Sequence, residues 1–580
     1  MRTRQLVLLF SAVFLLGITV ARLPATISVL RGRDDWETAL QEIHALISDR
    51  FYREPKQDEL YKGAIEGMVR ALDDQFTEFV PPADSALFEK ELTGQFVGIG
   101  ATIAIEDGVL TIVSPLEDSP ALKAGILPGD KVITIDGKPT RDILSTQDAV
   151  KVLTGKPGTS VVIGIERESK PMEITIPRGE ITAKVAHGLA WKNTAGAWDW
   201  AVDPARRIAY IQLTQFSPTI SGDLREAIEA ATKQLGAAPR GLILDLRDNP
   251  GGVLEEATEI ADMFLDAGTI VSTKGRAHRE HITKAEKGQI LPDVALAILI
   301  NGNSASASEI LAGSLADNNR AVIIGTRSYG KGVVQSLEEL RSLPGGLLKL
   351  TEQNYYLPSG RMIQRVPDAE TWGVDPTDGF HVVASDADRR AAFEIHRELD
   401  AIRPANPNSA PWKIGAAKWD NPQWLSTILH DPQLAAAVAA VQIRLDTGKW
   451  TPTGDPLPKN VAAAKNASKE LDSLERLRTR LEQEITRVDK RLDELAADHT
   501  RPQPKALESL WSDKIDVSGG KVEVFDKSGK RIATLDITGP DLERWLLEAD
   551  VKPHPPADAP AAAPTPPTPD AKPASPEAPK

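Results

Sequence analysis

Continuous apolar runs alternate with stretches of helical period between residues 208 and 325. The apolar runs have the length of buried strands, and each stretch between them repeats its apolar residues every three or four positions. The runs are 208–213, 241–247, 295–301 and 321–325, and the helical stretches are 220–235, 254–265 and 306–316. Such alternation predicts a sheet of parallel strands connected by crossover helices.

Short strands separated by turns are predicted over residues 96–178, where alternating apolar positions are closed by pairs such as Asp136-Gly137. On the N-terminal side of this region, apolar residues every three or four positions predict helices over 34–72. Helical patterns dominate again beyond residue 386, together with loops rich in tryptophan.

A heptad pattern extends from residue 469 to residue 495 and predicts a short coiled coil or helical hairpin. One core position is occupied by Leu471, Ile485 and Leu492 and interrupted by Arg478, and the other is occupied by Leu474, Leu481, Val488 and Leu495. The pattern fits oligomerisation, docking of an adaptor, or packing on the same chain. A small appended β/α unit is predicted over 503–548, and the Pro/Ala-rich residues from Pro553 predict a disordered tail.

Two arginines, Arg2 and Arg4, precede an apolar run over residues 6–21. A basic start followed by such a run is typical of an export signal. The run is short for a spanning helix, which needs about 20 residues, and Pro24 soon ends it. A cleaved signal peptide and an uncleaved anchor both remain open. We favour the anchor and expect an exported, periplasmic protein held at the inner membrane.

The formal net charge of −14 and the pI of about 5.3 argue against a large nucleic-acid-binding surface, which needs clustered lysine and arginine. The chain has no cysteine, which excludes disulfides, thiolate zinc sites and a cysteine nucleophile. His278 and His281 are three residues apart, but no partner lies at ligand spacing. We therefore expect no metal and no cofactor.

Three serines, Ser304, Ser306 and Ser308, lie where a predicted buried strand passes into a helix that begins near Ala307. A serine at such a turn exposes its hydroxyl beside free N–H groups and the positive end of the helix dipole, which stabilise an oxyanion. Each serine could equally be a helix cap, because serine is a favoured N-cap residue. From this segment alone the nucleophile and cap interpretations remain open.

Two further segments carry candidate chemistry. Lys331 lies between two glycines, with Gln335 four residues later, and it would serve as a general base only if burial lowered its pKa. A surface charge is the competing interpretation. The turn Asn249-Pro250-Gly251-Gly252 could present backbone N–H groups to an oxyanion. It could also be only a tight strand-to-helix turn that needs glycine. Nearby Asp245 and Arg247 are interpreted as a buried structural pair.

All three segments follow strands of the predicted parallel sheet, and the carboxyl ends of such strands are where sites assemble. Together they resemble the carboxyl-terminal processing proteases, also called tail-specific proteases. The resemblance covers residues 34–445 and rests on ordered motifs. They are YKGAIEGMVRALDD, GQFVGIGATI, SPALKAGILPGDKVITIDGKP, GLILDLRDNPGG, NGNSASASEILAGSL, GTRSYGKGVVQ and YYLPSGRMIQ.

The resemblance implies a serine endopeptidase with a PDZ domain, an acyl-enzyme and no metal. It implies Ser306 as nucleophile, Lys331 as base and Gln335 as the supporting residue. The implied oxyanion donors are the N–H of Ala307 and that of Gly251 or Gly252. The implied peptide-binding loop, which takes a substrate C-terminus, is Phe96, Val97, Gly98, Ile99 and Gly100.

Two segments depart from the family pattern. WGVDPTDGFHV only approximates the G-I-x-P-D segment, and ALDDQFTEFVPP replaces D-P-H-S-x-Y. Three other interpretations compete with this one: a catalytically silent or activator-dependent PDZ scaffold at the membrane, a small-molecule Ser/Lys amidase, and a tricorn-type relative using histidine. The presence of Ser306, Lys331 and Gln335 argues against a silent scaffold. The inserted PDZ-like region argues against a small-molecule amidase. The segment GKGVVQ fits a lysine-dependent enzyme better than a histidine-dependent one.

The predicted fold is an α/β multidomain chain. A protease core has a mixed β-sheet with crossover helices, an inserted β-rich PDZ domain, a helical N-terminal region and a C-terminal helical and coiled-coil extension. The predicted divisions are a signal peptide or anchor (1–30), N-terminal helices (31–92), PDZ domain (93–180), protease core (181–385), C-terminal helices (386–458), coiled coil (459–500), appended unit (501–550) and tail (551–580).

Overall fold

The computed structural model describes residues 35–457 and two short strands near the C-terminus. Within the first range, residues 86–87, 89–92, 107, 144, 367–368, 370, 407–411 and 413–414 are not described, and the later described segments are 521–525 and 530–536. The predicted export segment, coiled coil and Pro/Ala-rich tail therefore lie outside the described residues. Among the helices that are described, none combines the length and apolar character needed to cross a membrane.

A six-stranded sheet forms the centre of the larger unit, with the order β10-β14-β15-β18-β19 and with β13 paired to β14. Strands β14, β15, β18 and β19 are parallel, as the alternating sequence pattern predicts, whereas β10 and β13 join β14 antiparallel. Their bounds are β10 Ala186–His187, β13 Ala201–Asp203, β14 Ile208–Leu213, β15 Gly241–Asp245, β18 Ala295–Ile300 and β19 Ala321–Gly325.

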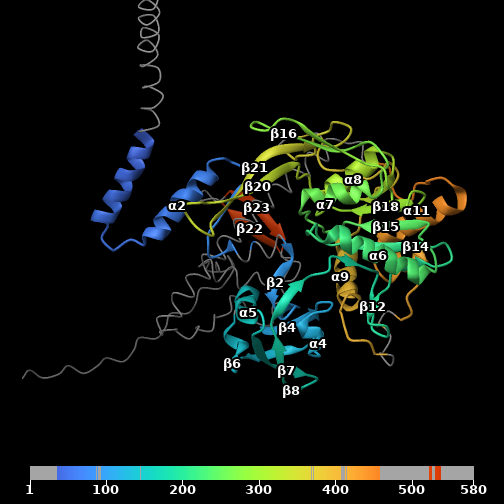
Figure 1. Cartoon of the computed structure of the whole chain (residues 1–580), viewed down its shortest axis with the longest axis horizontal. Coiled ribbons are helices and arrows are strands. Elements are labelled where there is room, and N and C mark those ends of the chain that lie inside the picture. The colour runs from blue at the N-terminus through green and yellow to red at the C-terminus, as the bar shows by residue number, and fades with distance from the viewer. Residues whose placement is uncertain are drawn as a thin grey trace, which may run out of the picture. The chain divides into compact units, whose positions relative to one another are not determined.

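Helices cover both faces of this sheet, because its parallel strands are apolar on both sides. Helices α6, α7 and α8 share one buried core with one face, and α10 and α11 share a second core with the other (Figure 1). The bounds are α6 Ile220–Leu235, α7 Leu254–Asp262, α8 Ala307–Asp317, α9 Asp386–Leu399, α10 Pro422–Thr427 and α11 Pro432–Thr447.

A second, antiparallel sheet brings an N-terminal strand against late parts of the chain. Its order is β1-β21-β16-β17, with β20 also paired to β21. The bounds are β1 Glu78–Val80, β16 Thr269–Gly275, β17 His281–Lys284, β20 Val333–Glu339 and β21 Leu347–Tyr356. Strand β1 follows the N-terminal helices, which occupy residues 35–50 and α2 (Gln57–Arg70).

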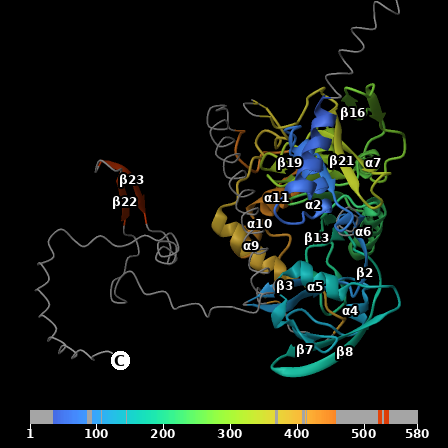
Figure 2. The same cartoon turned by 90° about the vertical axis from the view of Figure 1, so that its left-hand side faces the viewer.

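The β-rich region predicted over residues 96–178 has its own core and a six-stranded sheet of order β3-β4-β5-β7-β8, with β6 paired to β5. Figure 2 shows the long β7–β8 hairpin of this region, with α4 and α5 beside the sheet. The bounds are β3 Ala101–Glu106, β4 Val109–Pro115, α4 Pro120–Lys123, β5 Lys131–Ile135, β6 Lys138–Pro139, η1 Thr140–Asp142, α5 Thr146–Leu153, β7 Ser160–Arg167 and β8 Lys170–Pro177.

Three short ladders complete the described strands. Strands β2 (Gln95–Gly98) and β9 (Gly179–Thr182) pair antiparallel. The segments that enter and leave the β-rich region therefore lie side by side. Strands β11 (Trp191–Lys192) and β12 (Ala197–Trp198) form a small hairpin. In the smaller unit, β22 (Lys521–Phe525) pairs with β23 (Arg531–Asp536), and the helical part predicted for this unit lies outside the described residues.

The structure confirms the predicted fold class, a mixed α/β chain with crossover helices, a β-rich insertion and N-terminal helices. It also places the three candidate segments at one edge of the central sheet, since they follow the neighbouring parallel strands β15, β18 and β19. The predicted domain boundaries remain predictions.

Candidate active site

Ser306 precedes α8 and has φ 56° and ψ −114°, a backbone conformation outside the favoured regions for a residue with a side chain. A non-glycine residue held in such a region costs about 1–3 kcal/mol and is typical of functional sites. Ser306 forms a capping box with Glu309. The candidate nucleophile is therefore also the N-cap residue of α8. The cap interpretation and the nucleophile interpretation therefore apply to the same residue.

The neighbouring serines have structural partners. Ser304 donates its hydroxyl to the carbonyl of Leu246 at 2.8 Å, and Ser308 donates to the carbonyl of Asn249 at 3.0 Å. Both side chains are fully buried. In contrast, the hydroxyl proton of Ser306 has no acceptor among the described residues, and the side chain is partly exposed. Of the three, Ser306 is the serine available to a substrate.

Lys331 has a half-buried side chain, and its pKa is lowered to about 8. Burial is the main cause, because it disfavours the charged ammonium, and the like charge of Lys349 adds to it. The carboxylates of Glu309 and Asp74 act in the opposite direction. An amine with this pKa is roughly one-tenth neutral at pH 7 and about half neutral at pH 8, and the neutral amine is the state required of a general base.

The fully buried carboxylate of Glu309 joins the serine segment to the lysine segment. Its Oε2 accepts from the backbone N–H of Ser306 and from that of Lys331, both at 2.8 Å. Its Oε1 accepts from Ser328 Oγ at 2.5 Å and from Gly330 N–H at 2.7 Å. Burial raises the pKa of Glu309 to about 6, although these hydrogen bonds oppose the rise.

Tyr355 makes a second link between the same segments. Its hydroxyl lies 3.1 Å from the carbonyl oxygen of Ser306 and within hydrogen-bond reach of the carbonyl oxygen of Lys331. The ring is buried in β21, and burial raises the pKa of Tyr355 well above its ordinary value. Two buried side chains, Glu309 and Tyr355, thus fix the backbone of the candidate nucleophile relative to that of the candidate base.

Gln335 does not contact Lys331 through its amide group in this structure. Its Nε2 donates to the carbonyl of Phe76, a residue of the N-terminal segment that precedes β1. The Nζ of Lys331 lies over the ring of the same Phe76, 5.1 Å from its centroid. No hydrogen bond joins Lys331 Nζ to Ser306 Oγ within the described part of the chain, although both residues lie at the same sheet edge.

The paired glycines of the Asn249-Pro250-Gly251-Gly252 turn differ in their surroundings. Gly251 has φ 97°, and a Cβ there would lie 2.8 Å from Ser306 Cβ and 2.9 Å from Ala307 N, so only glycine fits beside the serine. Its own N–H donates to Asn249 Oδ1 at 2.9 Å. The N–H groups of Gly252 and Ala307 have no acceptor among the described residues.

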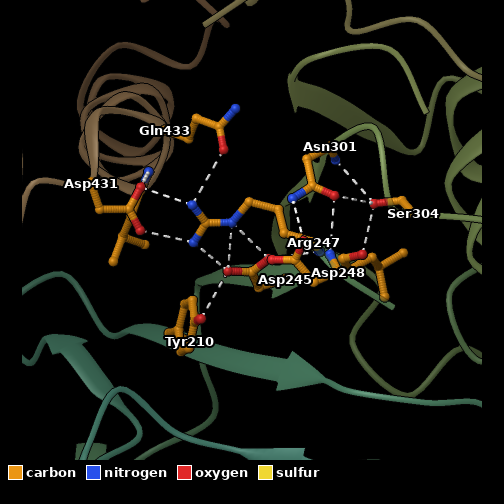
Figure 3. A network of polar contacts seen from close by, with 10 residues as sticks. Tyr210, Asp245, Arg247, Asp248, Asn301, Ser304, Asp431 and Gln433 are labelled. Carbon is orange, nitrogen blue, oxygen red and sulfur yellow. Dashed lines mark hydrogen bonds and ion pairs between the residues drawn. The ribbon is translucent and has the colours of Figure 1, made fainter. Parts of the chain in front are cut away.

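Asp245 and Arg247 form a buried ion pair, which confirms their structural interpretation. Arg247 Nη2 lies 2.5 Å from Asp245 Oδ2, and Arg247 also holds Asp431, the residue before α11, at 2.8 Å. Tyr210 OH donates to Asp245 at 2.8 Å. Figure 3 shows Arg247 between the two carboxylates. The network fixes the end of β15, from which the Asn249–Gly252 turn departs.

Replacing Arg247 by alanine is expected to lower the stability of the central domain by about 3–5 kcal/mol, because it leaves two buried carboxylates without a cation. Urea denaturation followed by tryptophan fluorescence measures the loss. The matched control is Arg225→Ala, which breaks an exposed pair with Glu259 at 3.6 Å and is expected to cost less than about 1 kcal/mol. Equal losses for the two variants would contradict a special role of the buried network.

The predicted peptide-binding loop covers the end of β2 and the turn into β3. Phe96, Val97 and Gly98 pair with β9, whereas Ile99 and Gly100 form the turn into β3. The carbonyls of Ile99 and Gly100 accept from Ala121 and Leu116, respectively. Strand β3 is the edge strand of its sheet, since it pairs with β4 alone. An edge strand of this type can accept a further strand from a peptide.

No group of three histidine, aspartate or glutamate side chains suited to a metal ion occurs among the described residues. His278 pairs instead with Glu352 at 3.0 Å, and its neighbour His281 begins β17. The arrangement that the structure does present is a serine, a lysine with a lowered pKa and two open N–H groups, which is suited to acyl transfer.

Sequence reasoning missed three residues that the structure places in the site: Glu309, Tyr355 and Phe76. Glu309 and Tyr355 lie within the quoted motifs NGNSASASEILAGSL and YYLPSGRMIQ. A glutamate three residues after an N-cap serine is itself a capping-box signal and could have been recognised. Phe76 lies in ALDDQFTEFVPP, the segment that differs from the family pattern, and no sequence motif marks it as a site residue.

Comparison with known proteins identifies two domains. The profile of peptidase family S41 matches residues 207–377, and that of the PDZ domain matches residues 111–167. The chain is 32% identical over 422 residues to a probable CtpA-like serine protease of Staphylococcus haemolyticus, covering 69% of this chain and 80% of the relative. It is 34% identical over 368 residues to a carboxy-terminal-processing protease of Bartonella bacilliformis, covering 62% and 81%.

Solved structures give weaker similarities. The photosystem II D1 C-terminal processing protease has 26% sequence identity and a TM-score of 0.35, with 61% of this chain and 90% of that chain covered. A putative S41 protease from Bacteroides fragilis has 17% identity and a TM-score of 0.37, with 60% and 91% covered.

Proposed function

The chain belongs to peptidase family S41, whose relatives include carboxy-terminal-processing serine proteases, and on this premise we propose that it is a Ser306–Lys331 endopeptidase that recognises substrate C-termini through its PDZ domain. The observation that carries the proposal is Glu309, whose single buried carboxylate oxygen binds the backbone of both residues. It supports a role for the two segments as one catalytic unit.

In the proposed reaction, the neutral amine of Lys331 takes the proton of Ser306 Oγ as the oxygen attacks the substrate carbonyl carbon. The oxyanion that forms is stabilised by the N–H of Ala307 and by the N–H of Gly251 or Gly252. Of these two glycines, Gly252 is the one whose N–H has no acceptor among the described residues. The Lys331 ammonium then protonates the leaving amine, which yields an ester on Ser306. Water hydrolyses this ester, with Lys331 again acting as the base.

Gln335 is proposed as the residue that supports Lys331, with its amide held by the carbonyl of Phe76. Catalytic contacts are often loose in a free enzyme and tighten in the substrate complex, so the lack of a Ser306–Lys331 hydrogen bond is compatible with activity. It favours an enzyme that is aligned by its substrate or by an activator.

The PDZ domain is proposed to bind a peptide along the edge of β3, with the terminal carboxylate at the loop Phe96–Gly100. Because Phe96, Val97 and Gly98 already pair with β9, the N–H groups of Ile99 and Gly100 are the proposed carboxylate donors. Protein or peptide substrates with free C-termini follow as the substrate class.

Export and attachment to the inner membrane are also proposed, and they rest on Arg2, Arg4 and the apolar run over 6–21. The heptads over 469–495 support a further proposal, oligomerisation or binding of an adaptor.

Cleavage of an unstructured protein with an apolar C-terminus tests the proposed function. The full chain is incubated with this substrate and with the same substrate bearing a C-terminal amide, and the products are identified by mass spectrometry. The substrate with a free C-terminal carboxylate should be cleaved about 10–100-fold faster than the amidated substrate, because each hydrogen bond to a charged group contributes about 1.5–3 kcal/mol. Equal rates would contradict C-terminal recognition, and a lack of any cleavage would contradict an enzyme active without an activator.

A further inference from the structure

The ring of Phe76 contacts the candidate base Lys331, and its carbonyl contacts the supporting residue Gln335. We propose that Phe76 is a positioning residue: its ring covers the Lys331 amine, and its carbonyl holds the Gln335 amide. The N-terminal segment 73–80 would then be part of the proteolytic machinery rather than a separate helical appendage. This inference rests on the proposed role of Lys331 as general base.

The contacts come from a segment that is far from both residues in the sequence. Lys331 Nζ is 5.1 Å from the centroid of the Phe76 ring, and Gln335 Nε2 donates to Phe76 O. Phe76 itself is half-buried, and its ring packs against the amine of Lys331, which is also half-buried. One residue thus contacts the amine of the candidate base through its ring and the supporting amide through its carbonyl.

The segment is fixed on both sides of Phe76. Asp74 accepts from Phe76 N–H at 3.2 Å and from Thr77 Oγ1 at 2.5 Å, which closes a local turn. Thr351 N–H donates to Thr77 Oγ1 at 3.1 Å, and β1 then pairs with β21, with Glu78 opposite Lys349. The position of Phe76 is therefore set by strand pairing with β21, the strand that also carries Tyr355.

The ring has two opposing effects on the amine. Its apolar bulk excludes water and favours the neutral form, whereas its negative face attracts an ammonium and favours the charged form. The other groups that act on Lys331 are Lys349 from β21, Glu309 from α8 and Asp74 from the same segment. Burial is the largest influence on Lys331, so water exclusion should outweigh attraction by the ring face.

A purely structural role for Phe76 is the competing interpretation, and it makes a different prediction. Loss of a packing residue lowers stability but leaves the protonation of Lys331 unchanged in the folded protein. A positioning role makes the pH at which Lys331 becomes neutral depend on the side chain at position 76. Two substitutions separate the opposing effects: Phe76→Ala removes both the bulk and the ring, whereas Phe76→Leu keeps an apolar cover without the ring face.

The test measures the protonation of Lys331 directly. The full chain carrying Ser306→Ala is treated with an amine-reactive ester at a series of pH values, and acylation of Lys331 is read by mass spectrometry. Only the neutral amine reacts, so the rate with Phe76 present should rise through about pH 8. Phe76→Ala should move this midpoint upward by about 1 pH unit, towards the ordinary lysine value. Phe76→Leu should leave it in place or lower it by about 0.5 unit.

Phe79→Ala is the matched control, because Phe79 is a buried aromatic residue of the adjoining strand β1. It should reduce stability without moving the midpoint. An unmoved midpoint in Phe76→Ala, or an equal upward shift in Phe76→Leu, would overturn the proposal. Since the readout needs no proteolysis, failure of the proposed function would appear separately, as an inactive protein that carries Ser306.

Discussion

Replacing Ser306 by alanine is expected to lower kcat/KM for peptide cleavage by about 10⁴-fold or more, because covalent catalysis is lost completely. The variant should fold, since an alanine has the same backbone needs and the Ser306 hydroxyl donates to no described residue. Its thermal unfolding midpoint should fall only slightly, because loss of the N-cap side chain costs about 1 kcal/mol. Activity is measured with the full chain on an unstructured protein substrate, with products read by mass spectrometry.

Ser308→Ala provides the matched control for this experiment. Ser308 lies two residues away, and its hydroxyl is committed to the carbonyl of Asn249, which retains a second donor in Ala305 N–H. We expect a loss of about 1 kcal/mol in stability and less than about tenfold in activity. A wild-type rate in Ser306→Ala, or a larger loss in Ser308→Ala, would show that the nucleophile has been misassigned.

The central sheet could be predicted because each of its strands is a local pattern. Most residues of the runs 208–213, 241–247, 295–301 and 321–325 are apolar, and the structure places β14, β15, β18 and β19 within them. Parallel order then brings the loops after β15, β18 and β19 to one edge. For this reason the approximate location of Ser306 and Lys331 followed from the sequence without any knowledge of side-chain contacts.

The contacts that complete the site depend on pairings between distant segments, which no local pattern encodes. Phe76 reaches Lys331 because β1 pairs with β21, and the register Glu78 opposite Lys349 cannot be read from either strand alone. The direction of the Gln335 amide has the same origin, since its acceptor is the Phe76 carbonyl. The sequence predicts the candidate reactive residues, whereas strand pairing determines what surrounds them.

Glu309 illustrates a different limit. Its position in the helix predicts an ordinary capping-box glutamate, which would be partly solvated. The structure instead buries it fully and gives it four donors from two loops, because the loop that contains Ser328 and Lys331 folds over the start of α8. Burial of this kind is a property of the tertiary fold and explains why sequence analysis did not assign the residue.

Replacing Glu309 by glutamine is expected to reduce kcat about 100-fold or more, although Ser306 and Lys331 themselves are not substituted. All four partners of the carboxylate are donors, so the amide nitrogen of glutamine must face at least one N–H or O–H that needs an acceptor. An orphaned buried donor costs about 1–3 kcal/mol. The loops should then shift, and a displacement of about 1 Å at a catalytic group can cost about 100-fold in rate.

The pH dependence of stability provides an independent readout of the same substitution. Because the pKa of folded Glu309 is raised to about 6 from 4.5, the native protein binds this proton more tightly than the unfolded chain. Stability should therefore fall as pH rises from 4.5 to 6, and Glu309→Gln should lack that contribution. Glu229→Gln, on the exposed face of α6, is the control for both measurements. If Glu309→Gln kept wild-type kcat while losing this pH dependence, the buried carboxylate would be a stability element that catalysis does not need.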